Sequence, residues 1–317
     1  LAQDLTEFLR AGLRTPVAFN ADGRILSRTK FFEPPAPSEE VSDVFALSED
    51  SKEVIRRAAE AEFGRLSPWK DRTLLDPKTT EILNTHFPLP ALLEVSRSPA
   101  LPDYLRQRIA LAIWVRAIVL QRPLVADNVV PDLVKFSPEM RSVLAPYLGA
   151  RTAKEKEWAA LFVMLRNPNL SPLIADGLPQ PSSNDGDSMY YFESAWWCPP
   201  SLTEYSMEGD LVSKNVTVPS FLTAAQVAVA KRDHTRLIEI GDAKSYLGKR
   251  VLEWAKAAPA DPRLPEALFI ASHANAQYKY GCDGWNHDST TKEQTERLLR
   301  TRYPNSVWTE KLRNEKR

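Results

Sequence analysis

Apolar residues recur along most of this chain with the period of an α-helix. One example is the set Trp158, Leu161, Phe162 and Leu165, which stands at positions i, i+3, i+4 and i+7 and therefore shares one face of a helix. No segment between turn signals alternates cleanly between apolar and polar positions, as a half-buried strand would. The pattern predicts an all-α protein with at most a trivial ribbon of strand.

The same pattern divides the chain into four parts. Residues 1–76 are the least regular, and we expect them to form an N-terminal arm with short helices. Residues 77–177 form a predicted helical layer, in which prolines open successive helices and leave room only for short connections. Residues 178–218 contain no convincing helix or strand, and such long irregular segments are commonly functional or disordered. Helices return over residues 219–317.

The helical pattern also predicts the core. The helix that follows Pro102 is apolar nearly all round, so we expect it to be the central helix of its layer. Burial is expected at the following positions on inward faces: Ile109, Ile113, Trp158, Phe162, Leu247, Val251, Trp254, Leu268 and Tyr278.

The C-terminal part predicts a pair of helices and the start of a third. Apolar residues recur at helical spacing over residues 264–278, a second helix follows over residues 291–302, and Val307 begins another. Tyr303 and Pro304 separate the second helix from the third. This pattern resembles a tetratricopeptide-type helical hairpin, in which a tyrosine-proline pair closes one antiparallel helix pair and launches the next.

The resemblance implies both a fold and a general kind of function. Antiparallel helical hairpins would stack into an α-solenoid-like body, and the irregular segment would interrupt it as one long aromatic-rich loop. The concave and lateral faces of such a body suit protein or peptide partners. The resemblance therefore implies a scaffold rather than a reaction.

Charge and hydropathy argue against nucleic acid, anionic lipid and a membrane span. The 317 residues carry 41 lysines and arginines against 41 aspartates and glutamates, so no long-range field favours nucleic acid or anionic lipid. No apolar run approaches the roughly 20 residues that a membrane-spanning helix needs. The longest one, over residues 109–120, is interrupted by Arg116.

The two cysteines, Cys198 and Cys282, both stand in irregular segments rich in aromatic residues. A disulfide between them would attach the irregular segment to the C-terminal hairpin. It would also indicate an oxidising compartment, so we expect an extracytoplasmic location such as the periplasm or cell envelope. Two buried free thiols are the alternative, and they would indicate the cytoplasm.

Aromatic residues crowd one stretch of the irregular segment: Tyr190, Tyr191, Phe192, Trp196 and Trp197. Because aromatic rings are costly to leave in water, we expect these residues to be buried. The favoured interpretation is that they attach the loop to the helical layer. They also make a candidate interaction surface.

The same stretch offers the ingredients of a carbohydrate site. In such sites aromatic faces stack on sugars and two carboxylates perform acid–base chemistry. The available carboxylates are those of Asp185, Asp187 and Glu193, although no spacing singles out a pair.

Other chemistry has no support in the sequence. Neither a Gly-rich phosphate loop nor a nucleophile elbow occurs. His287 lies near Cys282, but the paired cysteine and histidine spacings of zinc sites are missing, and residues 283–288 do not fit a calcium loop. The sequence therefore assigns no catalytic, cofactor-binding or metal-ligating residue.

The sequence favours a non-enzymatic helical scaffold or assembly subunit that binds protein partners in a larger assembly, in a bacterial cell envelope. The alternative is an all-α glycan-processing enzyme that uses the carboxylates and tryptophans of residues 185–198. An enzyme of that kind would place two carboxylates across a deep cleft, whereas a scaffold would leave them on an open face.

Overall fold

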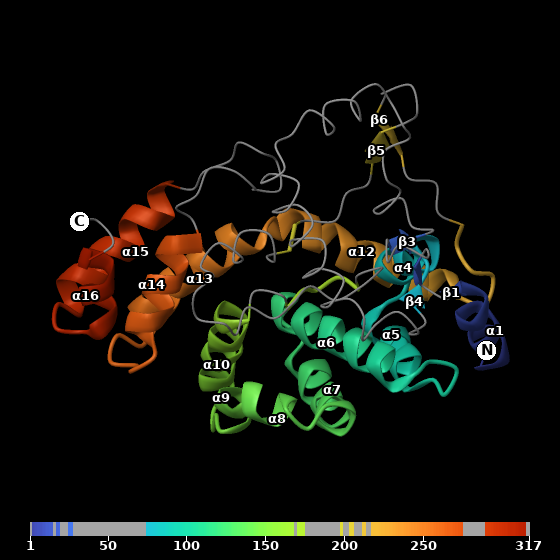
Figure 1. The fold of residues 1–317 in the computed structure, drawn as a ribbon, viewed down its shortest axis with the longest axis horizontal. Coiled ribbons are helices and arrows are strands. Elements are labelled where there is room, and N and C mark those ends of the chain that lie inside the picture. The colour runs from blue at the N-terminus through green and yellow to red at the C-terminus, as the bar shows by residue number, and fades with distance from the viewer. Residues whose placement is uncertain are drawn as a thin grey trace, which may run out of the picture. The chain divides into compact units, whose positions relative to one another are not determined.

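The computed structural model describes residues 2–14, 17–19, 25–27, 74–167, 170–174, 197–198, 203–205, 211–213, 217–274 and 289–314. This part of the chain contains thirteen helices and three two-stranded antiparallel ribbons, whose strands are two or three residues long (Figure 1). The prediction of an all-α fold with at most trivial strand is confirmed.

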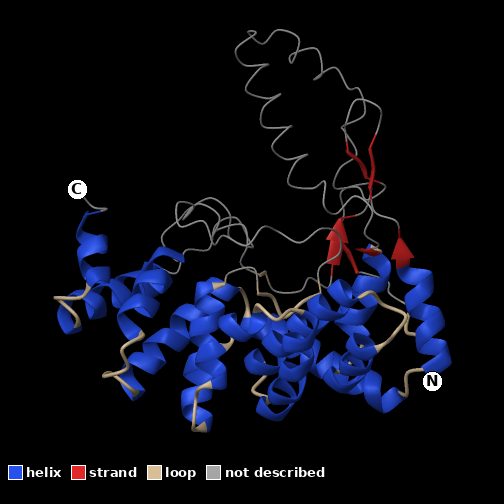
Figure 2. Cartoon of the chain, turned by 60° about the horizontal axis from the view of Figure 1, so that its bottom comes forward, coloured by secondary structure: helices blue, strands red, loops and turns tan. Residues whose placement is uncertain are grey.

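The first eight helices are α1 (Ala2–Gly12), α4 (Pro77–His86), α5 (Leu89–Arg97), α6 (Asp103–Val119), α7 (Pro123–Phe136), α8 (Met140–Val143), α9 (Ala145–Leu148) and α10 (Ala153–Arg166). The later ones are α12 (Ala224–Ile240), α13 (Ala243–Ala257), α14 (Leu264–Ala274), α15 (Ser289–Arg302) and α16 (Val307–Asn314). The ribbons, drawn red in Figure 2, pair β1 (Leu13–Arg14) with β4 (Leu74–Leu75), β2 (Val17–Phe19) with β3 (Ile25–Ser27), and β5 (Thr203–Tyr205) with β6 (Leu211–Ser213).

The chain divides into two compact units. The larger unit comprises residues 1–5, 81–174 and 180–317, and the smaller one comprises residues 6–80 and 175–179. The four-part organisation inferred from the sequence stays a prediction.

In the smaller unit, the end of α1 lies against the start of α4. The backbone N–H of Asp76 donates to the carbonyl of Gly12 at 2.8 Å. The Asp76 carboxylate in turn accepts from the backbone N–H of Thr79 at 3.0 Å and from its hydroxyl at 2.8 Å. A Cβ atom added to Gly12 would come within 2.2 Å of the Thr79 hydroxyl oxygen, so the close approach requires glycine.

One group of helices in the larger unit is built around α6, which packs against both α5 and α7. Ten of its 17 residues are buried, and Ile109 and Ile113 are fully buried. The expected central helix is therefore confirmed. The turn into α7 places Gln121 at φ 58°, in the left-handed region that residues other than glycine seldom adopt.

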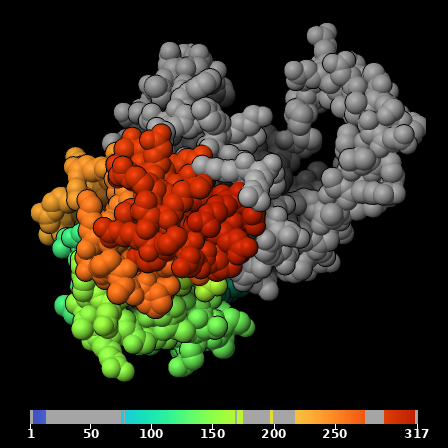
Figure 3. Space-filling model, turned by 90° about the vertical axis from the view of Figure 1, so that its left-hand side faces the viewer, coloured from blue at the N-terminus to red at the C-terminus, as the bar shows by residue number. Residues whose placement is uncertain are grey.

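A second group contains α10 and α13 to α16. Helix α14 contacts α10, α13, α15 and α16, and none of its residues over 264–273 is exposed. Figure 3 shows the red helices α15 and α16 packed beside the orange helices α13 and α14. From α13 to α16, each helix thus contacts the next helix along the chain.

The predicted core residues are buried wherever the structure describes them: Ile109, Ile113, Trp158, Phe162, Leu247, Val251, Trp254 and Leu268 are each 5 % exposed or less. Tyr278 lies outside the described residues. These positions confirm the helical register that the apolar spacing predicted.

Candidate functional site

Trp197 is the described member of the predicted aromatic surface, and it lies against α13. Its side chain is 7 % exposed, and its carbonyl accepts from the backbone N–H of Ala243 at 3.1 Å. Its ring centroid lies 6.3 Å from that of Tyr246, tilted by 51°. These contacts attach the chain at this point to the first turn of α13.

The remaining residues of the aromatic surface and of the alternative carbohydrate site lie outside the described residues: Tyr190, Tyr191, Phe192, Trp196, Asp185, Asp187 and Glu193. The interaction surface and the carbohydrate site both stay predictions.

Cys198 follows Trp197 and is not a free thiol. Cys282, its predicted partner, falls within residues 275–288, outside the described part of the chain. The bridge between these two residues stays a prediction.

A buried arginine on α6 is the centre of one polar cluster. Arg116 on α6 is 2 % exposed, and its Nε donates to the carbonyl of Pro172 at 2.8 Å. Its Nη2 donates to Oδ1 of Asn84 at 3.0 Å, and that amide also pairs with both backbone groups of Ile174 at 2.8 and 2.9 Å. Burial lowers the pKa of Arg116 to about 10, while the charge of Asp233 acts in the opposite direction. The guanidinium therefore stays charged at neutral pH and fixes residues 172–174 on α4 and α6.

From the sequence, Arg116 was interpreted only as a break in an apolar run, and this network was not predicted. The sequence did contain a signal for it. A charged residue in a helix that is apolar nearly all round is expected to be buried, and a buried charge needs hydrogen-bond partners.

A second cluster joins α7, α9 and α10. The Tyr147 hydroxyl donates to Asp127 at 2.7 Å, and the Lys156 ammonium donates to both oxygens of the same carboxylate at 2.8 and 2.9 Å. Tyr147 is 2 % exposed, and its ring packs edge-on against Trp114 at 5.4 Å. Burial and the neighbouring Asp127 raise the pKa of Tyr147, so the phenol stays protonated. A tyrosine this enclosed ties helices together and is not positioned to meet a substrate.

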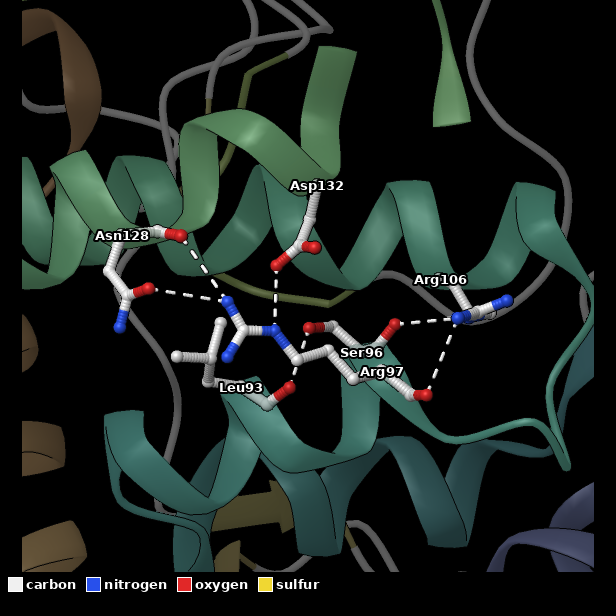
Figure 4. Close-up of polar contacts among 6 residues, drawn as sticks. All are labelled: Leu93, Ser96, Arg97, Arg106, Asn128 and Asp132. Carbon is white, nitrogen blue, oxygen red and sulfur yellow. Dashed lines mark hydrogen bonds and ion pairs between the residues drawn. The ribbon is translucent and has the colours of Figure 1, made fainter. Parts of the chain in front are cut away.

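A third cluster ties the end of α5 to α6 and α7 (Figure 4). Arg97 donates from Nε to Asp132 at 2.8 Å and from Nη2 to the carbonyl and side-chain oxygens of Asn128, both at 3.3 Å. Arg106 donates to the carbonyls of Ser96 at 3.3 Å and Arg97 at 3.4 Å. The second arginine thereby satisfies carbonyls that the end of a helix leaves without intrahelical partners.

The turn between α13 and α14 carries a further ion pair. Arg263 donates to Asp261 from its backbone N–H at 3.0 Å, from Nε at 2.9 Å and from Nη2 at 2.6 Å. Burial alone would raise the pKa of Asp261, but the hydrogen bonds and charge of Arg263 outweigh it and hold the pKa below its usual value.

Asp261→Asn should therefore destabilise the protein at neutral pH by about 1 kcal/mol, because it removes the charge that Arg263 binds. A carboxyl group with a lowered pKa stabilises the folded state above its ordinary pKa of about 4, and the contribution is lost as the pH falls through the lower folded value. Chemical denaturation at a series of pH values should show the variant converging on the wild type in acid. Glu94→Gln, at an exposed position on α5, is the matched control. A difference that stayed constant down to the lowest pH would contradict the lowered pKa.

The described residues contain no group of three or more side chains that could hold a metal ion. Among the helices that the structure describes, none has both the length and the apolar character of a bilayer-spanning segment. Comparison with protein-family models, with curated proteins and with solved structures finds no match to this chain.

Proposed function

We propose that this chain is a non-enzymatic helical scaffold that binds protein partners as a subunit of a larger assembly. The observation that supports this most is the packing order of the C-terminal helices. Helix α13 contacts α14 and α15, and α14 contacts α15 and α16. Contacts with the next helix and the next but one are typical of stacked helical hairpins, whose function is to present extended faces to other proteins.

The contacts around Tyr303 support a hairpin of the tetratricopeptide type. The Tyr303 hydroxyl donates to the carbonyl of Pro259, in the turn between α13 and α14, at 2.5 Å. The Thr309 hydroxyl donates to the carbonyl of Tyr303 at 2.7 Å, and Arg302 donates to the carbonyl of Ala255 at 3.0 Å. The tyrosine-proline turn between α15 and α16 is thus tied to the end of α13, as a turn between stacked hairpins would be.

The polar clusters favour the same proposal over the enzyme. The clusters around Arg116, Asp127 and Arg97 each join two or three helices through donors and acceptors that satisfy one another. A catalytic carboxylate pair would instead need two acids with separated pKa values facing a cleft. The proposed bridge between Cys198 and Cys282 would place the scaffold in an oxidising compartment such as a bacterial periplasm or cell envelope.

Co-purification from the cells that make the protein, after amine-reactive cross-linking, tests the proposal. We expect a partner protein at a constant stoichiometry, with cross-links mapped by mass spectrometry to lysines on the outward faces of the helices. We also expect no turnover on a panel of polysaccharides. Polysaccharide hydrolysis that Glu193→Gln abolished would overturn the scaffold and establish the enzyme.

A further inference from the structure

Helix α12 is long but contributes little to the core. Of its 17 residues, Ala230, His234 and Leu237 are buried. Its outward face consists of exposed residues at helical spacing: Ala224, Ala225, Ala228, Lys231, Arg232, Thr235, Arg236 and Glu239. The first half of this face is lined with alanine and the second half is mainly basic.

The basic half carries more cations than exposed acids, since Lys231, Arg232 and Arg236 stand against Glu239. Within the described part of the chain, neither Lys231 nor Arg232 forms an ion pair closer than 4.0 Å. Arg236 pairs with Glu239 at 2.9 Å, but both side chains stay more than half exposed. The remaining acid, Asp233, is half-buried, and burial raises its pKa. The face therefore has an excess of positive charge.

Arg122 is a fourth cation, and it lies close enough to α12 to act on Asp233. It is exposed in the turn before α7, and its charge acts on Asp233 together with those of Arg116 and Arg232. Leu124 follows two residues later, at the first turn of α7, and is 83 % exposed, the largest exposure among the described large apolar side chains. Protein interfaces commonly combine an exposed apolar side chain, which supplies contact area, with nearby exposed cations, which orient the partner.

We propose that the outward face of α12, together with Arg122, binds an acidic helical segment of the protein partner. This inference rests on the proposed scaffold function and names the chemistry of its partner. The alanines allow the backbone of a second helix to approach closely, and the cations of Lys231, Arg232 and Arg122 face its carboxylates. A polyanion such as nucleic acid fits less well, because Glu239 lies on the same face and the whole chain carries no net charge.

The test uses the full chain and a fluorescein-labelled synthetic helix of about 20 residues, rich in alanine and leucine, with glutamates along one face. A second peptide with lysines at the same positions is its matched control. We expect fluorescence anisotropy to show binding of the glutamate peptide alone, weakening as salt is added. The double variant Lys231→Glu/Arg232→Glu should weaken this binding by about tenfold or more.

The control variant Lys249→Glu/Lys256→Glu makes the same change of charge at exposed positions on α13. It should alter the affinity by less than about twofold, because the reversed charges lie outside the proposed face. Thermal denaturation checks that both variants fold.

Three results would overturn the inference: no binding of the glutamate peptide, an equal loss in both double variants, or binding of duplex DNA or phosphatidylserine vesicles that the α12 variant abolishes. A cellular partner that co-purified equally with the wild type and the α12 variant would also overturn it. That last result would contradict the α12 binding face but would still support the scaffold function, so the experiment distinguishes the two proposals.

Discussion

Replacing Trp254 with alanine should lower the free energy of unfolding by about 3–5 kcal/mol. Trp254 on α13 is fully buried. Its ring stacks on that of Trp158 from α10, with centroids 5.9 Å apart and planes within 7°, and Phe162 meets it edge-on at 6.3 Å. The substitution would remove the ring shared by both contacts and leave a cavity between α10 and α13.

Chemical denaturation followed by circular dichroism measures this change. Trp158→Ala should have an effect of similar size, and the double variant should show a coupling of about 0.5–1.5 kcal/mol between the two rings. Leu124→Ala, at a side chain that is 83 % exposed, is the control and should change stability by less than about 0.5 kcal/mol. An unchanged denaturation midpoint for Trp254→Ala would show that the assigned register of α13 is wrong.

Local sequence signals predicted the helices well because the forces that start and orient a helix act within a few residues. Thr152 stands three residues before Glu155, which is the spacing of a capping box, and it caps α10 by accepting from the backbone N–H of Glu155 at 3.1 Å. Helices were expected to return from residue 219, but α12 begins later, at Ala224, because Thr223 and Gln226 form a capping box there. That signal was present in the sequence and was overlooked.

Contacts between distant segments could not be predicted in the same way. The spacing of apolar residues shows which face of α10 is buried, but it does not specify that Trp158 meets Trp254. The ribbons pair strands of two or three residues, which are too short to show a readable alternation of apolar and polar positions. The excess of positive charge on α12 is hidden by a net charge of zero, because charge balance over a whole chain says nothing about its distribution on one face.

Arg116 is the position at which sequence pattern and structure differ most. An arginine within an apolar helix interrupts the hydrophobic pattern, yet Arg116 is buried in the folded protein. The guanidinium reaches Pro172 and Asn84, which lie 56 and 32 residues away in the chain. A lysine could not bind Pro172 and Asn84 in this way. Its donors all lie on one nitrogen, whereas the guanidinium donates from three nitrogens in fixed directions.

Arg116→Met should therefore destabilise the protein even though methionine suits an apolar helix. The carbonyl of Pro172 would be left buried without its donor, and each such acceptor costs about 1–3 kcal/mol. Asn84 would also lose the contact that orients its amide, so the backbone N–H of Ile174, which donates to Asn84 at 2.9 Å, should exchange its hydrogen faster. Denaturation and amide hydrogen exchange measure the two effects.

The matched control is Arg141→Met, at an exposed position on α8, which should change stability by less than about 0.5 kcal/mol and leave the exchange of Ile174 as it is. Replacement of a buried charge by an apolar side chain can be neutral when no partner is left unsatisfied. If Arg116→Met matched the wild type in both stability and exchange, the desolvation cost of the guanidinium would equal what its hydrogen bonds contribute. Residues 172–174 would then be held in place by the packing of Ile174 and Leu170, which are 4 % and 6 % exposed, rather than by the arginine.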